Sequence, residues 1–384
     1  MTNLDIVNIK NDSWLSLSLQ ELNNNISSHY SIDEKQYVEQ LYQLAYDDSE
    51  SPQIKNVAES IIGTVRANDV SIFFDLEKLL QEYSLSDEDG VTLMCLAEAL
   101  LRVPDSATVD ALIQDKLSAG EWSRHFSKDN SLFVNASTWG LAVAGKLVEV
   151  STSSITRVFK NSTKPVIRAA VDRAMRIMGQ HFVLGRTVEE AMKNARKYIK
   201  DGYDYSYDML GESAITQADA DRYYKSYMSA LEKIAANTHD KKQQPSLSIK
   251  LSALHPRFEE THRDRVLIEL AETVEKLVLK GIEHNIGITI DAEEADRMEL
   301  TLALFELIYA KPYMRGWDKF GLVVQAYSKR ALPALCWITK LAKNYGDEIP
   351  IRLVKGAYWD SEIQHSQEMG LNDYPVFTRK EYTD

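Results

Sequence analysis

Cysteine is scarce in this chain, which holds only Cys95 and Cys336 among its 384 residues. The two lie far apart, and neither has a second cysteine or a histidine at the spacing of a metal site. This pattern argues against a disulfide framework and against a zinc site, so we expect two thiols in the protein core and no bound metal.

Long apolar runs are lacking as well. No uninterrupted apolar stretch reaches the roughly 18 to 20 residues that cross a bilayer. The N-terminus has neither the basic start nor the apolar core of a signal peptide. The sequence therefore predicts a cytoplasmic protein.

Positive charge is under-represented. The chain has 44 Lys and Arg against 57 Asp and Glu, a formal net charge of −13, and residues 1–50 contain nine acidic residues and two lysines. Because nucleic acid is densely negative, this balance opposes binding to it. We expect no DNA-binding arm and no nucleic-acid partner.

Glycine-rich phosphate loops are missing too. The sequence contains neither G-x-G-x-x-G nor G-x-x-x-x-G-K-[ST], which argues against a Rossmann or P-loop nucleotide site. It has no nucleophile elbow either. Any chemistry must therefore come from other polar side chains.

What is present is the composition of a folded protein, with two patterns of secondary structure. Hydrophobic residues make up 44% of the chain and charged residues 26%. Over the first 150 residues the helical period dominates, as in 86–103. From about residue 203, short runs rich in Ile, Val and Leu alternate with helix-period segments, which favours an α/β fold.

Six segments are predicted strands. They are Tyr203–Leu210, Ser246–Leu254, Ile286–Glu293, Phe320–Tyr327, Ile349–Tyr358 and, more weakly, Tyr374–Arg379. Helical stripes separate consecutive segments, and such repeated β–α units form parallel strands. The sequence thus predicts a helical N-terminal region followed by an incomplete TIM-like (β/α)8 barrel of about six strands.

Polar side chains occur where this sheet should be apolar. Strands of a parallel sheet are covered on both faces, yet the side-chain period of two points polar residues of four consecutive strands to one face: Lys250, Asp291, Gln325, and Arg352 with Tyr358. Burying an ion is costly unless it is paired or serves a ligand. Since barrel enzymes carry their sites at the carboxyl ends of the strands, the set predicts a functional site.

Other interpretations of these residues remain open. Lys250 could pair with Asp291, and Arg352 with Glu293, as structural ion pairs. Tyr358 and Trp359, at the end of the fifth strand, could pack at the rim. An inward lysine beside a carboxylate is also the arrangement of a Schiff-base aldolase. A non-enzymatic alternative is a helical interaction module joined to a degenerate barrel.

Ordered motifs at these strand ends resemble the bifunctional proline utilization A family. They are SIKLSALHPRF (248–258), ITIDAEEADR (288–297), FGLVVQAYSKR (320–330) and IRLVKGAYWDSEI (351–363). Upstream, similar motifs are LSDEDGVTLMCLAEALLRVPD (85–105), SLFVNASTWGL (131–141) and YSYDMLGE (205–212). The resemblance covers the chain from about residue 50 onward.

The resemblance implies a proline dehydrogenase. Such an enzyme oxidises L-proline to pyrroline-5-carboxylate with FAD and passes the electrons to a membrane quinone, as the first step of proline catabolism to glutamate. It implies peripheral association with the inner face of the membrane and allows a homo-oligomer.

The resemblance also implies roles for particular residues. The flavin would be held by Gln325, Lys355, Trp359 and Arg352, the last lying near flavin N5. Lys250 would face the proline carboxylate. The catalytic set would be Lys250, Asp291, Arg352 and Tyr358, with Asp291 and Tyr358 lining the substrate pocket.

The domain organisation follows from the same resemblance. We expect an N-terminal helical arm (1–50), a helical linker or scaffold domain (51–165) and the proline dehydrogenase barrel (166–384). The sequence shows neither the ribbon-helix-helix DNA-binding start of one branch of the family nor its aldehyde dehydrogenase domain. Because eight strands close such a barrel, we expect a truncated barrel with exposed sheet edges, inactive by itself.

Overall fold

The computed structural model describes residues 9–44, 51–67, 183–238 and 243–384. The chain divides into two compact units, one of Met1–Asp48 with Ala195–Asp384 and the other of Ser49–Asn194. The helix predicted over 86–103, and Cys95 within it, lie outside the described residues. The predicted domain boundaries at residues 50 and 165 stay predictions.

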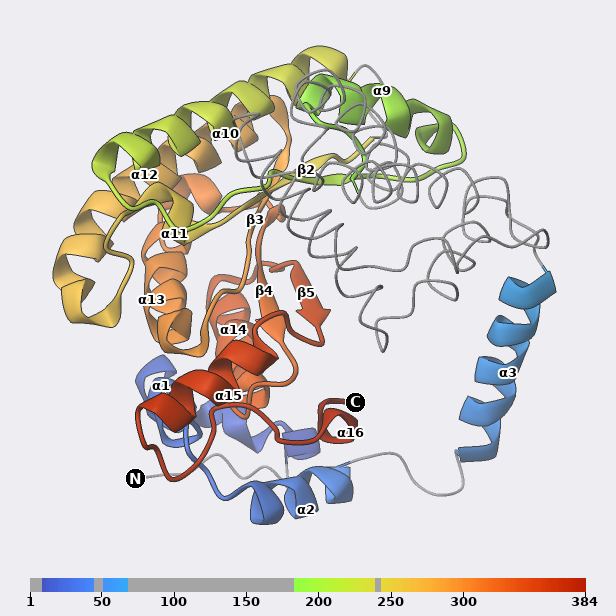
Figure 1. Ribbon diagram of the computed structural model, residues 1–384, viewed down its shortest axis with the longest axis vertical. Coiled ribbons are helices and arrows are strands. Elements are labelled where there is room, and N and C mark those ends of the chain that lie inside the picture. The colour runs from blue at the N-terminus through green and yellow to red at the C-terminus, as the bar shows by residue number, and fades with distance from the viewer. Residues whose placement is uncertain (1–8, 45–50, 68–182, 239–242) are drawn as a thin grey trace, which may run out of the picture. The chain divides into compact units, whose positions relative to one another are not determined.

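A parallel five-stranded sheet forms the centre of the first unit. Its strands are hydrogen-bonded in chain order: β1 (Ser206–Asp208), β2 (Ser246–Ile249), β3 (Gly287–Ile290), β4 (Phe320–Gln325) and β5 (Ile351–Val354). The connecting helices lie along the outer side of the curled sheet (Figure 1): α10 (Gln217–Asn237), α12 (Arg263–His284), α13 (Met298–Tyr309) and α14 (Ala331–Tyr345). The predicted α/β fold, part of a TIM-like barrel, is confirmed.

Local chemistry explains where these elements begin and end. Thr216 caps α10, because its hydroxyl accepts from the Asp219 N–H while Asp219 accepts from the Thr216 N–H. Helices α12 and α14 end at Asn285 and Gly346, both in the left-handed conformation. Cys336 of α14 is buried, as predicted for a core thiol, and burial raises its pKa to about 12.

Residues 9–44 form an N-terminal arm that packs on the same unit. Its helices are α1 (Leu19–Ser28) and α2 (Glu34–Leu44), and α1 lies against α14. Lys329, which follows β4, is fully buried and donates to the Ile32 carbonyl (3.2 Å) and to Asp373 (2.8 Å), with Glu34 at 3.6 Å. The arm is therefore fixed to the loop that leaves β4.

Shorter elements complete the described structure. They are the 3₁₀ turns η1 (Ile9–Asn11), η2 (Ser13–Ser16), η5 (Glu260–His262), η6 (Ala295–Arg297) and η7 (Pro312–Met314), and the helices α11 (Leu251–Leu254), α15 (Trp359–Glu368) and α16 (Lys380–Thr383). Helix α3 (Ser51–Ala67) belongs to the second unit, and α9 (Val188–Ile199) spans the boundary between the units.

The predicted sixth strand, Tyr374–Arg379, is wrong. This segment makes one isolated antiparallel bridge, Ser328 to Val376, and the Phe377 N–H donates to the Tyr327 carbonyl at 2.8 Å. It crosses the loop after β4 instead of lying parallel to β5. Val376 and Phe377 are buried there, so local packing accounts for the apolar pattern that indicated a strand.

The predicted second strand is also shorter than expected. It ends at Ile249, and Leu251–Leu254 form the helical turn α11. Lys250 stands between them in extended conformation. The lysine thus lies at the carboxyl end of β2, directly before the chain turns into α11.

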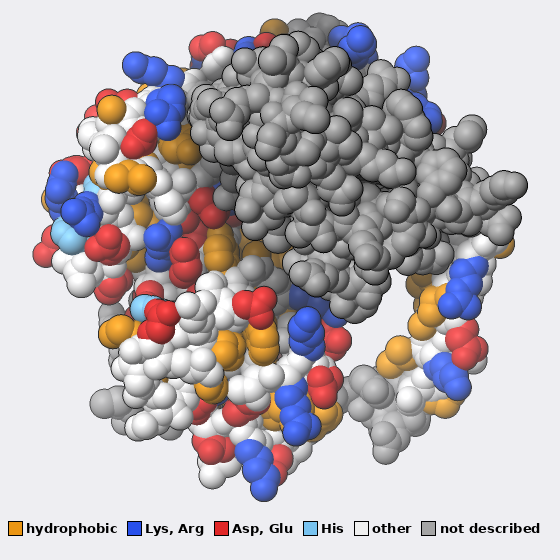
Figure 2. Space-filling view, in the orientation of Figure 1, with side chains coloured by type: hydrophobic (Ala, Val, Ile, Leu, Met, Phe, Trp, Pro, Cys, Tyr) orange, Lys and Arg blue, Asp and Glu red, His pale blue; other side chains and the backbone are white. Residues whose placement is uncertain are grey.

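The described surface carries charges of both signs. On the face drawn in Figure 2, Lys and Arg side chains are interspersed with Asp and Glu over the helices of the first unit. Among the described residues, no helix is long and apolar enough to cross a membrane.

Candidate active site at the strand ends

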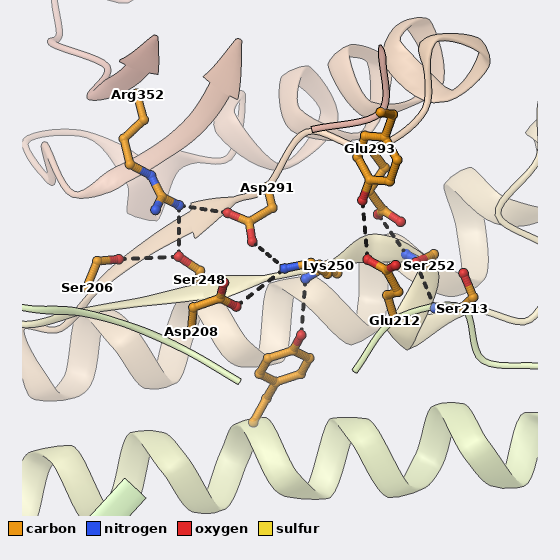
Figure 3. Close-up of polar contacts among 12 residues, drawn as sticks. Ser206, Asp208, Glu212, Ser213, Ser248, Lys250, Ser252, Asp291, Glu293 and Arg352 are labelled. Carbon is orange, nitrogen blue, oxygen red and sulfur yellow. Dashed lines mark hydrogen bonds and ion pairs between the residues drawn. The ribbon is translucent and has the colours of Figure 1, made fainter. Parts of the chain in front are cut away.

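Three charged side chains from different strands meet at the carboxyl edge of the sheet (Figure 3). Lys250 follows β2, Asp291 follows β3, and Arg352 lies in β5. Asp291 Oδ2 is 2.8 Å from Lys250 Nζ, and Asp291 Oδ1 is 2.8 Å from Arg352 Nη2. One carboxylate therefore joins both cations.

Burial and charge act in opposite directions on Lys250. Its side chain is 17% exposed and that of Asp291 is 14% exposed. Burial alone lowers the pKa of Lys250, but the hydrogen bond and charge of Asp291, with the charge of Asp208, outweigh it and raise that pKa. The ammonium stays protonated at neutral pH.

Arg352 is held by a second contact. Its Nη2 also donates to Ser248 Oγ at 2.8 Å, and Ser248 Oγ lies 3.3 Å from Ser206 Oγ. The side chain is 41% exposed, while its buried Nε has no hydrogen-bond partner among the described residues. The guanidinium is positioned on one side and retains donor capacity on the other.

Of the two ion pairs considered from the sequence, the structure contains one. The Lys250–Asp291 pair is confirmed, but Glu293 does not pair with Arg352: it contacts Arg297 at 2.8 Å and accepts from the Ser252 N–H at 3.0 Å. Burial raises the pKa of Glu293. Glu293 therefore braces the loop after β3.

Gln325 has a different neighbourhood from the ion cluster. Its Nε2 donates to the Glu293 carbonyl (2.9 Å) and its Oε1 accepts from the Ala357 N–H (2.9 Å). The buried amide thus connects the loops after β3 and β5.

The other three predicted site residues, Tyr358, Trp359 and Lys355, have partners outside the ion cluster. The Tyr358 hydroxyl donates to Glu212 at 3.2 Å, and burial, with the charge of Glu212, raises the pKa of Tyr358. Trp359 Nε1 donates to the Phe377 carbonyl at 2.8 Å. Lys355 is exposed and pairs with Asp384.

Two residues at this edge were missed from the sequence: Ser206 and Asp208 of β1. Asp208 Oδ1 lies 3.4 Å from Lys250 Nζ. The signal was present, because the alternation that puts tyrosines on one face of Tyr203–Leu210 puts Ser206 and Asp208 on the other. No group of three or more His, Cys, Asp or Glu in the described residues could hold a metal ion.

The fold and this site define the class of the protein: a partial α/β barrel with charged groups at the carboxyl ends of its strands, as in barrel enzymes. The family model "Proline dehydrogenase" matches residues 191–384, half of the chain. The chain belongs to the proline dehydrogenase family.

Known proteins agree with this assignment. The chain is 49% identical over 353 residues to the bifunctional protein PutA of Klebsiella aerogenes, with 90% of this chain and 26% of that protein aligned. It is 27% identical over 205 residues to proline dehydrogenase 1 of Bacillus subtilis, 53% of this chain and 60% of that protein. A crystal structure of the D779Y mutant of Bradyrhizobium japonicum PutA matches 92% of this chain and 36% of its own length, at a TM-score of 0.64 and 39% identity.

The chain spans about a quarter of the length of the curated PutA proteins that it matches. A second family model, "DNA-binding domain of Proline dehydrogenase", matches residues 75–182. This match conflicts with the prediction that no part of the chain binds nucleic acid. The matched residues lie outside the described ones, and a net-charge argument over a whole chain cannot detect one such domain.

Proposed function

We propose that this chain supplies the substrate and flavin site of a proline dehydrogenase, which oxidises L-proline to pyrroline-5-carboxylate with FAD. The Lys250–Asp291–Arg352 cluster at the strand ends carries the proposal. Its two cations suit the carboxylate of an amino-acid substrate, which is what a member of this family needs to bind. Electron transfer to a quinone, peripheral membrane binding and a homo-oligomer are the finer parts of the same proposal.

Lys250 would bind the carboxylate of proline. A protonated ammonium that is partly exposed attracts a carboxylate. Asp291 fixes the position of this ammonium and also binds Arg352, which brings a second positive charge to the same place. Positioning a small substrate in this way accelerates its reaction by reducing the entropy lost at the transition state.

The residues present fit a flavin. Arg352 has a buried Nε without a partner among the described residues, and Lys355 extends an exposed ammonium from the same strand end. Both suit the acceptor atoms and negative charge of a flavin nucleotide. When bound, FAD would supply the two-electron oxidation. Gln325 would help to bind the flavin by holding the loops after β3 and β5 in place. The Trp359 ring would contact the flavin.

Tyr358 would line the substrate side. Its hydroxyl donates to Glu212 in the loop after β1, so this contact joins the loop after β5 to the loop after β1. The raised pKa keeps the phenol protonated, and hence able to donate a hydrogen bond.

The Schiff-base alternative is less well supported. Imine formation needs a neutral amine, usually a lysine whose pKa is lowered. The two carboxylates next to Lys250 raise its pKa instead. The arrangement favours an ammonium that binds an anion.

The visible spectrum of the purified chain with FAD, before and after L-proline, tests this function. A chain that supplies both sites retains FAD, and proline then bleaches or shifts the flavin bands; the inactivity predicted from the sequence would leave the bands unchanged. Lys250→Met should keep FAD and lose the response to proline, since it removes the ammonium. Lys276→Met, which changes an exposed lysine of α12, should behave as wild type.

Failure to take up FAD, or a bound flavin that does not respond to proline, contradicts the proposal. Bleaching by proline would in turn show that the predicted inactivity of the isolated chain is wrong.

A further inference from the structure

Strand β1 lines the ion cluster with a row of polar side chains. Ser206 and Asp208 lie two residues apart and share one face, while Tyr207 between them is buried on the other. Ser206 contacts Ser248, and Asp208 contacts Lys250 (Figure 3). The first strand thus adds a second carboxylate to the site.

The two carboxylates hold Lys250 unequally. Asp291 lies 2.8 Å from the ammonium, is 14% exposed, and is also bound by Arg352. Asp208 lies 3.4 Å away and its side chain is 50% exposed. An anion approaching Lys250 from solvent would therefore compete with Asp208 rather than with Asp291.

The surrounding charges agree with this difference. Burial raises the pKa of the Asp208 carboxyl and the negative charge of Asp291 raises it further, while Lys250 and Arg352 act against the rise. The ionised state of Asp208 is consequently less favoured than that of an ordinary aspartate. Releasing it from Lys250 costs less than releasing Asp291, which has two cationic partners.

We propose that Asp208 is the exchangeable counter-ion of Lys250: it holds the ammonium in place in the empty site and yields that position to the substrate carboxylate, while Asp291 stays bound. This role rests on the proposed function, in which Lys250 binds the carboxylate of proline. Asp208 is then a positioning residue that also sets the affinity for the carboxylate.

Residue-specific acylation of Lys250, measured by mass spectrometry and normalised to Lys276, tests the first part. Asp208→Asn removes one negative charge next to the ammonium, so its pKa falls. Lys250 should then react about fivefold faster at a fixed pH. Ser206→Ala, a change on the same face of β1 without contact to Lys250, should react as wild type.

Protection of Lys250 by a carboxylate tests the second part. Cyclopentanecarboxylate has the ring size of proline and no amine to consume the reagent, and cyclopentanecarboxamide is its uncharged counterpart. Asp208→Asn should be protected at about fivefold lower cyclopentanecarboxylate concentration than wild type, because the competing charge is gone. The carboxamide should protect both proteins equally.

Unchanged acylation in Asp208→Asn, or protection that is no stronger than in wild type, overturns the exchange. Asp208→Glu should restore the wild-type rate, which distinguishes loss of the charge from a general disturbance of β1. If the carboxylate protects Lys250 but L-proline leaves the flavin spectrum unchanged, the proposed function fails while the exchange stands.

Discussion

Asp291 uses both carboxylate oxygens, one for Lys250 and the other for Arg352. An amide in its place can accept from only one cation and turns its NH₂ toward the other. The geometry of the site therefore depends on an acid at this position, and not simply on a polar residue of similar size.

Asp291→Asn should lower kcat/KM for L-proline by about 100-fold, because both cations lose their common support and the substrate is misplaced. Steady-state kinetics with a soluble quinone as acceptor would measure it. Glu272→Gln, an exposed carboxylate change in α12, is the matched control. If kcat/KM falls no further in Asp291→Asn than in Glu272→Gln, the role assigned to Asp291 is contradicted.

Contacts between loops and the N-terminal arm hold together the segments next to the site. The N-terminal arm, the loop after β4 and the segment 373–378 converge on Lys329, whose ammonium is fully buried. Tyr37 of α2 stacks on Phe377, and the Phe377 carbonyl accepts from Trp359. The arm thus supports the segment against which Trp359 rests.

Lys329→Met should destabilise the chain by about 3 kcal/mol, because it leaves the carboxylates of Asp373 and Glu34 without their buried cation. Urea unfolding measures the change. Lys343→Met on the exposed side of α14 should have little effect. Asp373→Asn combined with Lys329→Met should recover part of the loss, and a double variant as unstable as the sum of the single ones would contradict the pairing.

Gly356, in the loop after β5, has a φ of +135°. A Cβ at this position would clash with the Tyr327 ring. Gly356→Ala should therefore cost about 1–3 kcal/mol of stability and displace the loop that carries Lys355 and Tyr358. Gly370→Ala, with a positive φ but open space around it, is the control in the same unfolding measurement and should cost less.

Two buried carboxyls of the described residues make the stability of the folded chain depend on pH. Burial raises the pKa of Glu293 and of Glu362, which accepts from the Ala295 N–H at 2.6 Å. A carboxyl with a raised folded-state pKa binds more protons in the folded than in the unfolded state. Stability then decreases as pH rises from the ordinary glutamate value through the raised one.

Glu362→Gln should flatten this dependence, since the amide does not titrate. Unfolding free energies from denaturant titrations at a series of pH values above 4.5, the unperturbed value for Glu, would show it. Glu283→Gln, an exposed carboxylate of α12, should leave the slope in place. Equal slopes in wild type and Glu362→Gln would contradict the raised pKa.

The sequence by itself determined the parallel α/β fold and indicated which polar strand residues form the candidate site. The period of two in each strand and the β–α repetition are local properties, and polar residues at buried strand positions indicate a site wherever the sheet is placed. Lys250, Asp291 and Arg352 were predicted on that basis, and the structure brings them together.

Only the tertiary structure decided which charges pair, because pairing depends on strand order, register and the position at which each strand ends. Asp291 was found to join two cations, Glu293 to bind Arg297, and Asp208 to reach Lys250. The segment Tyr374–Arg379 has the composition of a strand, but long-range packing against the loop after β4 and the N-terminal arm gives it another conformation.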